Sequence, residues 1–352
     1  MSGYARLDGW TPSPIEALAD EATGWVTEQI YARYAHVLMP FGARGRFQTR
    51  QDLRYHVEFL AAAVEVSALV YFTDYVLWLA GVLKARGVPV QTLAESLRLL
   101  KTFFEGRLEP SVLGRAEECL DAGLAALADA PKASGPLYQA RMPEPHAAAC
   151  VFTGALIEGD AAAARAIIED IAGDGPGYVQ IATHLVQPAL YAIGGKWERN
   201  EISVAQEHLA SALAQTLLVE LFLEGPFEAP HGGKILLAGV EHNQHVIGLR
   251  MVADAFELAG WQVQYLGADT PTGALLSQVD KTSPDRMALS VSLVQQLPAL
   301  RHGIAALRAE FGGRCPVIIV GGIATNQFNG VWRRLGADAW SPDAESALDL
   351  TA

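Results

Sequence analysis

The stretch GVEHNQHVIG, residues 239–248, carries two histidines at a spacing that suits chemistry. His242 and His245 stand three residues apart, in a chain with only nine histidines. An imidazole can ligate a metal, act as a general base, or fill a polar loop. Zinc needs three or four ligands, and no cysteine or third histidine stands nearby in the sequence. The pair alone therefore leaves another kind of metal site, a base and ordinary loop content open.

A longer pattern begins at His245. Gly248 follows three residues later, then 41 residues (249–289), Ser290 to Ser292, 28 residues (293–320), and the Gly321–Gly322 pair. This pattern resembles the base-off, His-on cobalamin signature, D-x-H-x-x-G…S-x-L…G-G. The resemblance implies that His245 binds cobalt, a borderline metal that imidazole suits. It also implies that small residues make room for the cofactor's nucleotide tail, with contacts from Val246, Ile247, Gly248, Ser290, Ser292, Gly321 and Gly322.

Two positions depart from that signature. Asn243 stands where the family has an acidic residue two before the histidine, and Ser292 stands where it has leucine. In the family the carboxylate orients the imidazole and raises its basicity. An asparagine can still accept a hydrogen bond but carries no charge. We therefore expect Asn243 to orient the ring and to leave a weaker, more labile bond from His245 to cobalt.

A second constellation precedes the first in the sequence: Trp197, nine residues, then Glu207 and His208. This W-x9-EH pattern resembles the upper-face cap of B12-dependent photoreceptors, the light-sensing repressors of the MerR type. The resemblance covers about 146–352 and implies adenosylcobalamin, with the tryptophan over the adenosyl group and the Glu–His pair contacting it or a partner subunit. Glu198 replaces the family's histidine after the tryptophan, so we expect His208 or water to bind cobalt after illumination.

The first third of the chain combines arginines with aromatic residues. No basic recognition helix is visible in residues 1–140. The region is similar to the helical domain of photocobilins, B12 photoreceptors that also hold biliverdin. That resemblance implies noncovalent bilin binding, because arginines in an aromatic pocket suit a flat ligand with carboxylates. The alternative is a helical core with an arginine-capped surface. The residues expected to hold the bilin are Arg50, Arg54, His56, Tyr71 and Tyr75.

These residues must be positioned by three regions. Residues 1–135 read as helices, and residues 130–145 are rich in small residues and proline and read as a linker. Residues 146–228 contain four amphipathic segments, which predict a four-helix bundle. From residue 233 to 352 short apolar runs alternate with helical segments, which predicts a flavodoxin-like doubly wound parallel sheet of the Rossmann-like, cobalamin-binding kind. The apolar runs expected as strands are KILLAGV, WQVQYLG, MALSVSL and PVIIVGG.

Net charge, cysteine content and hydropathy argue against several classes of function. The 352 residues carry a net charge of −13, which argues against direct nucleic-acid binding. Three scattered cysteines and no signal core favour a cytoplasmic protein, and interrupted apolar windows argue against a membrane span. We expect a light sensor rather than an enzyme, one that forms a homo-oligomer or acts through a protein partner. Two alternatives remain, a corrinoid methyl carrier of a methyltransferase system and a B12-binding antirepressor.

Overall fold

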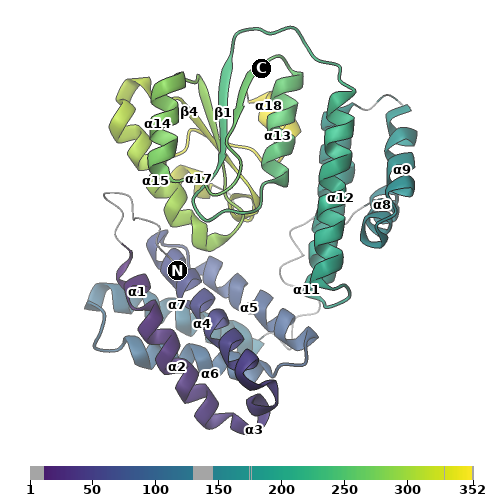
Figure 1. Cartoon of the computed structure of the whole chain (residues 1–352). Coiled ribbons are helices and arrows are strands. Elements are labelled where there is room, and N and C mark those ends of the chain that lie inside the picture. Colours follow the sequence, from purple (N-terminus) through teal and green to yellow (C-terminus); the bar gives the residue numbers. More distant parts are fainter. Residues whose placement is uncertain (1–11, 130–145, 174, 176, 329, 351–352) are drawn as a thin grey trace. The chain divides into compact units, whose positions relative to one another are not determined.

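The structure is a computed structural model that describes residues 12–129, 146–173, 175, 177–328 and 330–350 (Figure 1). The chain divides into two units, residues 1–140 and 141–352. The predicted linker at 130–145 lies outside the described residues. No helix within the described ranges is long and apolar enough to cross a membrane.

The described part of the first unit is helical, as predicted. Its core contains Phe72, Phe103 and Phe104, all fully buried. The helical pattern of residues 52–87 breaks into two helices at Ser67, which has a φ of 53° and so cannot continue a right-handed helix. The helices are α1 (Pro14–Ala17), α2 (Ala19–Arg33), α3 (Ala35–Leu38), the 3-10 turn η1 (Met39–Phe41), α4 (Gly42–Glu65), α5 (Leu69–Ala85), α6 (Val90–Phe104) and α7 (Pro110–Asp129).

The second unit begins with the four predicted helices. The third contains a π-helical segment just before Pro188. A proline has no N–H for the carbonyl four residues earlier, and the ring of His146 donates to that carbonyl of His184 instead (Nε2 to O, 2.7 Å). The elements are α8 (Ala147–Glu158), α9 (Ala161–Gly173), α10 (Tyr178–Ile181), the π segment η4 (Ala182–Val186), α11 (Gln187–Glu198) and α12 (Val204–Leu223).

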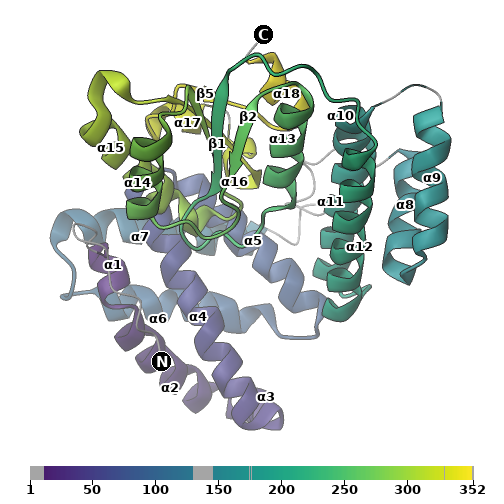
Figure 2. The ribbon, with the colours of Figure 1, turned by 45° about the horizontal axis from the view of Figure 1, so that its top comes forward.

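A five-stranded parallel sheet follows, in the order β2-β1-β3-β4-β5, which is the flavodoxin-like order. Helices α13 and α18 cover one face, and α14 and α15 cover the other (Figures 1 and 2). The strands are β1 (Lys234–Gly239), β2 (Gln262–Tyr265), β3 (Arg286–Ser290), β4 (Val317–Gly321) and β5 (Ala339–Trp340). The helices and 3-10 turns are α13 (Ile247–Leu258), α14 (Thr272–Thr282), η5 (Val294–Gln296), α15 (Leu297–Phe311), η6 (Gly312–Arg314), α16 (Ile323–Asn326), α17 (Val331–Arg334) and α18 (Ala344–Asp349).

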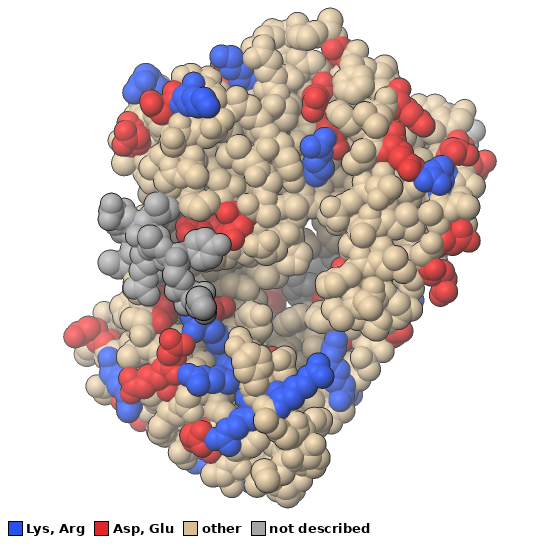
Figure 3. All heavy atoms as spheres, viewed as in Figure 1, with Lys and Arg blue, Asp and Glu red and all other residues tan. Residues whose placement is uncertain are grey.

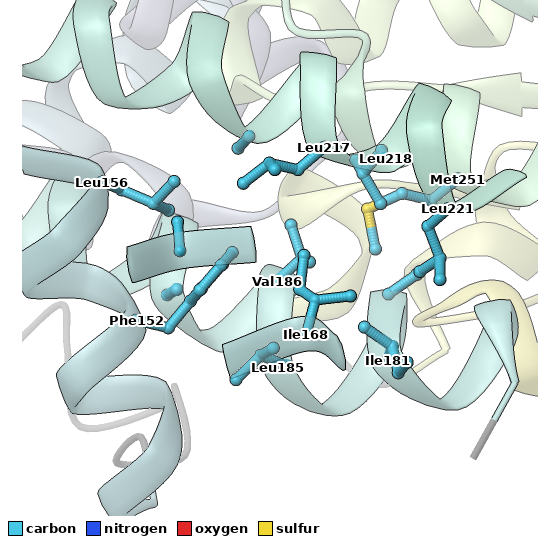
Figure 4. Close-up of a cluster of buried hydrophobic side chains, with 14 of the residues drawn as sticks. Phe152, Leu156, Ile168, Ile181, Leu185, Val186, Leu217, Leu218, Leu221 and Met251 are labelled. Carbon is cyan, nitrogen blue, oxygen red and sulfur yellow. The ribbon is translucent and has the colours of Figure 1, made fainter. Parts of the chain in front are cut away.

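The helical bundle and the sheet domain share one hydrophobic core. Met251 of α13 packs among buried side chains of the bundle, including Phe152 and Leu218 (Figure 4). A buried polar bond crosses the same boundary, because the hydroxyl of Tyr178 on α10 donates to a carboxylate oxygen of Asp254 on α13 (2.6 Å). Burial raises the pKa of the Asp254 carboxyl above its ordinary value. The helix that follows the His245 loop is thus fixed to the bundle that carries Trp197.

Candidate cofactor site

The residues of the first pattern meet at the carboxyl edge of the sheet. Gly239, the last residue of β1, pairs with Ser290 of β3, and Ser290 pairs with Gly321 of β4. The loop from β1 to α13 carries His245 beside them, and the hydroxyl of Ser292 lies 3.5 Å from the carbonyl oxygen of His245. Parallel sheets of this order bind ligands at that edge. Residues up to 82 positions apart (239 to 321) therefore converge at one place.

Asn243 is fully buried and holds the loop through the backbone. Its side-chain oxygen accepts from the backbone N–H of His245 (3.1 Å), and its side-chain nitrogen donates to the carbonyl oxygen of Ser290 (2.9 Å). In the structure this side chain therefore bonds the backbone of His245 and not its imidazole, and the weaker bond from His245 to cobalt stays a prediction. Its oxygen fixes the backbone at His245, so Asn243 affects the position of the imidazole only through the backbone.

His242 is a turning point of the same loop. Its backbone has a φ of 68°, a region that few non-glycine residues adopt. Its N–H donates to a carboxylate oxygen of Asp269 (2.6 Å), and its carbonyl accepts from the side-chain amide of Gln296 (2.9 Å). Sequence reasoning missed both partners, because neither belongs to a motif and each comes from a different βα connection.

His245 has a side chain that is exposed to solvent. Surrounding protein atoms nevertheless desolvate its charged form and hold its pKa below the ordinary 6.5, while the carboxylate of Glu207 acts in the opposite direction. The ring is therefore neutral at pH 7 and has a free lone pair, the form in which imidazole ligates a metal.

The small residues at the edge differ in what they allow. A side chain at Gly248 would meet nothing within 4 Å, so this position borders open space. At Gly321 a Cβ would lie 2.9 Å from the carbonyl oxygen of Ser341, and at Gly322 it would lie 2.2 Å from that of Val291. Gly322 also has a φ of 99°, which favours glycine. The two later glycines are thus required by the protein's own backbone, and only Gly248 offers free space.

The donor set fits a corrinoid held through one imidazole. Within the described ranges, no group of three or more His, Cys, Asp or Glu side chains could hold a metal ion. His245 therefore stands as a single neutral donor at the sheet edge, with open space at Gly248. A corrinoid needs only one such donor from the protein, because its macrocycle supplies the equatorial ligands. In a bound complex His245 would hold the lower face, beside Ser290 at the end of β3 and Ser292 just after it.

The second constellation lies on the bundle next to this edge. Trp197 is half-buried and packs against the bundle core, as does Ile247 at the start of α13, and Val246 immediately precedes that helix. Glu207 lies in the first turn of α12. Its carboxylate accepts from the ring of His208, which is 74% exposed, and from the hydroxyl of Ser211 (2.8 Å). The structure thus brings the W-x9-EH residues and the His245 loop to neighbouring elements.

The residues expected to hold a bilin are split between core and surface. Tyr71, Tyr75 and His56 are buried, and a hydrogen bond joins the Tyr75 hydroxyl and Nδ1 of His56 (2.7 Å). Burial lowers the pKa of His56 to about 3, so the ring is neutral. Arg54 is exposed and forms ion pairs with Asp20 and Glu58, and Arg50 is also exposed. Figure 3 shows Lys and Arg gathered on the face of this unit around α4. This arrangement matches the alternative of a helical core with an arginine-capped surface.

Both parts of the second unit match known family models. Residues 233–350 match the B12 binding domain, and residues 152–221 match a second B12 binding domain model. The chain contains a B12 binding domain. The sequence-based prediction of a cobalamin-binding α/β domain is thereby confirmed, whereas the adenosyl form of the cofactor and biliverdin stay predictions.

Named relatives fall into two groups. Over 152 residues the chain is 32% identical to the HTH-type transcriptional repressor CarA of Myxococcus xanthus, covering 43% of this chain and 50% of that protein. It is 27% identical to a corrinoid protein of Desulfitobacterium hafniense (strain Y51) over 164 residues, 45% of this chain and 74% of that one. The chain thus matches half the length of the repressor. The structure of the Methanosarcina barkeri monomethylamine corrinoid protein aligns with 57% of this chain and 94% of its own at 20% identity and a TM-score of 0.49.

Proposed function

We propose that the protein is a light sensor that binds adenosylcobalamin through His245 and caps its upper face with the bundle. The observation that carries the proposal is the hydrophobic core that α11 and α12, which carry the W-x9-EH residues, share with α13, the helix that begins two residues after His245. This packing holds the W-x9-EH helices and the His245 loop within one unit. The similarity to a repressor and the B12 binding domain match support the same conclusion.

Each residue has a physical role in this proposal. The neutral ring of His245 holds cobalt from below, and Gly248 leaves room beside it. Bound adenosylcobalamin would supply a cobalt–carbon bond that visible light cleaves. Trp197, half-buried against the bundle core, would then lose the group that it covers. A contact that differs between two states can shift an equilibrium between them, so we propose that this loss changes the quaternary structure.

His208 is the candidate for the site's response to light. Its ring is 74% exposed and is held by the carboxylate of Glu207, so it can turn away from that partner without breaking a buried contact. Glu198 stands where the family has a histidine, so it cannot serve in the same way. We propose that His208, or water, occupies the vacated cobalt position. The output would be an oligomer change or a protein partner, with no catalytic role and no direct contact to nucleic acid.

A corrinoid methyl carrier is the rival function, since several relatives are corrinoid proteins. A carrier cycles cobalt through a nucleophilic state, for which the family uses an acidic residue beside the histidine. Here the side chain of Asn243 is hydrogen-bonded to the backbone of His245 and of Ser290. That arrangement supplies no carboxylate to the imidazole and therefore favours sensing over methyl transfer.

The test compares absorption spectra and size-exclusion profiles of the adenosylcobalamin complex in the dark and after green light. We expect a spectral change and a change in elution volume on illumination. Trp197→Phe should weaken or abolish the elution change, because the upper-face packing is reduced. Trp261→Phe is the matched control, since Trp261 precedes β2 at the opposite edge of the sheet. A complex whose spectrum and elution ignore light would rule out the sensor and leave the carrier.

Biliverdin binding by the helical unit is a separate proposal, supported by the resemblance to photocobilins and by the exposed arginines around α4. Because Tyr71, Tyr75 and His56 are buried together, a bilin would have to displace part of that packing. Titration with biliverdin tests it. A red-absorbing band that Arg50→Ala weakens would support the site, whereas an unchanged biliverdin spectrum would exclude it.

A further inference from the structure

Gln296 joins two connections of the sheet with one buried amide. It ends the short turn η5 between β3 and α15 and is 4% exposed. Its side-chain oxygen accepts from the backbone N–H groups of Ser292 (3.2 Å) and Leu293 (3.0 Å). Its side-chain nitrogen donates to the carbonyl oxygen of His242 (2.9 Å). The connection after β3 is thus tied to the connection after β1.

The residue that receives this bond is the turning point of the His245 loop. His242 has a φ of 68°, a conformation that persists in a non-glycine residue when its surroundings fix it. Asp269 holds its N–H at 2.6 Å and Gln296 holds its carbonyl at 2.9 Å. One residue further on, the side-chain oxygen of Asn243 accepts from the N–H of His245. The direction in which the chain leaves His242 therefore sets where the imidazole of His245 lies.

We propose that Gln296 is a positioning residue for the His245 imidazole, acting through the carbonyl of His242. This inference rests on the proposed cobalamin site, where His245 is the cobalt ligand. The oxygen and the nitrogen of the amide make different contacts, which makes the proposal testable. Its oxygen organises its own turn, and only its nitrogen reaches the histidine loop. A change that removes the nitrogen and keeps the oxygen should release the loop while leaving the turn intact.

Gln296→Glu is that change, because it preserves size and an acceptor oxygen but places a second oxygen against the carbonyl of His242. We expect the Kd for adenosylcobalamin to rise about tenfold, as for other residues that orient a metal ligand. We also expect the absorption spectrum of the bound cofactor to gain a fraction without histidine coordination. Gln278→Glu is the matched control, since its amide bonds Gln264 at 2.9 Å between α14 and β2. It should leave both quantities unchanged.

A second readout uses the protein without cofactor. Amide hydrogen exchange over residues 242–245 should be faster in Gln296→Glu than in the wild type and unchanged in Gln278→Glu. Asp269→Ala loosens the same residue from its other side at an exposed position, so it provides a variant that should fold if Gln296→Glu does not. We expect the same direction of change and about a threefold rise in Kd, because the variant loses the bond to the N–H of His242 and a longer, exposed bond from Gln244 (3.2 Å).

The outcomes separate the two proposals. If the wild type binds cobalamin with histidine coordination and both variants match it in Kd, spectrum and exchange, the positioning role of Gln296 is wrong and the cobalamin site stands. If the wild type binds no cobalamin, the proposed function is wrong. Faster exchange at residues 242–245 in the variants would then still establish that Gln296 and Asp269 position the loop.

Discussion

The β1–α13 loop and the helix pair α4–α5 each hold a histidine whose pKa is lowered by desolvation. The two rings differ in how far solvent reaches them. His56 is 3% exposed, and its Nδ1 is hydrogen-bonded to the hydroxyl of Tyr75, itself stacked on Phe59 at 3.8 Å between ring centroids. His245 is exposed, at a sheet edge where Gly248 leaves open space. A lowered histidine pKa therefore does not identify a ligand site by itself. A ligand site also needs access to a ring nitrogen from outside the fold.

Removing the His245 side chain is the strongest test of this contrast between the two histidines. His245→Gly should raise the Kd for adenosylcobalamin at least about a hundredfold, because the proposed lower-face ligand of cobalt is lost. His242→Gly is the control. Glycine adopts the positive φ of that position readily, and the backbone bonds to Asp269 and Gln296 remain possible, so its Kd should stay within about twofold. Equal losses in the two variants would show that the loop, and not the His245 ring, determines binding.

The pH dependence of the free energy of unfolding tests the other histidine of the comparison, His56. The folded pKa of His56 is about 3, below the unfolded value of 6.5, so between these pH values only the unfolded chain takes up the proton. The stabilisation is complete above pH 6.5 and is lost as pH falls toward 3. Between pH 7 and pH 5 the loss should be about 2 kcal/mol.

Urea denaturation at the two pH values measures this, with His56→Gln as a reference that cannot titrate. The wild type should lose about 2 kcal/mol more than the variant between pH 7 and pH 5. An equal loss in the two proteins would mean that His56 is protonated in the folded state, and the contrast between the two histidines would disappear.

Sequence patterns predicted the long elements well and the short ones poorly. TGALLSQVDKT, one of the helical segments that alternate with the apolar runs, is α14 residue for residue. The last strand, β5, has only two residues and so carries no alternating pattern. TNQFNGVWRRLG, the last of these helical segments between strands, belongs to two short helices, α16 and α17, and α17 begins after Gly330 at a φ of 79°. Periodicity needs several residues, and these elements are held by the sheet around them.

The candidate site likewise contains positions that the sequence predicts and contacts that it does not. The positions of His245, Ser290 and Gly321 follow from strand ends, which the sequence places well because each strand is a distinct apolar run. The partners of Asn243 and Gln296 could not be read in advance. Both bond to backbone atoms, and a backbone carbonyl or N–H looks the same at every residue of a sequence. Only the pairing of β1 with β3 brings Asn243 to Ser290.

Asn243→Asp gives the smallest effect of these three predictions and the clearest conflict between motif and geometry. The motif predicts that the acid strengthens cobalamin binding, because the family's carboxylate supports the histidine. The structure predicts the reverse. The side-chain nitrogen of Asn243 donates to the carbonyl of Ser290, and a carboxylate oxygen there would face another acceptor. That carbonyl keeps a second donor, the N–H of Val240 at 3.1 Å, so the cost should be about 1 kcal/mol.

The measurement is the Kd of adenosylcobalamin for wild type and variant at pH 7, together with thermal stability of the cofactor-free proteins. We expect about a fivefold weaker complex and a lower melting temperature, because 1.4 kcal/mol corresponds to a factor of ten. Tighter binding would mean that the acid reaches the imidazole once cofactor is bound, and that the backbone role of Asn243 is specific to the cofactor-free loop. Weaker binding would mean that the loop after β1 has adapted to a neutral amide, so that restoring the motif residue alone cannot restore its function.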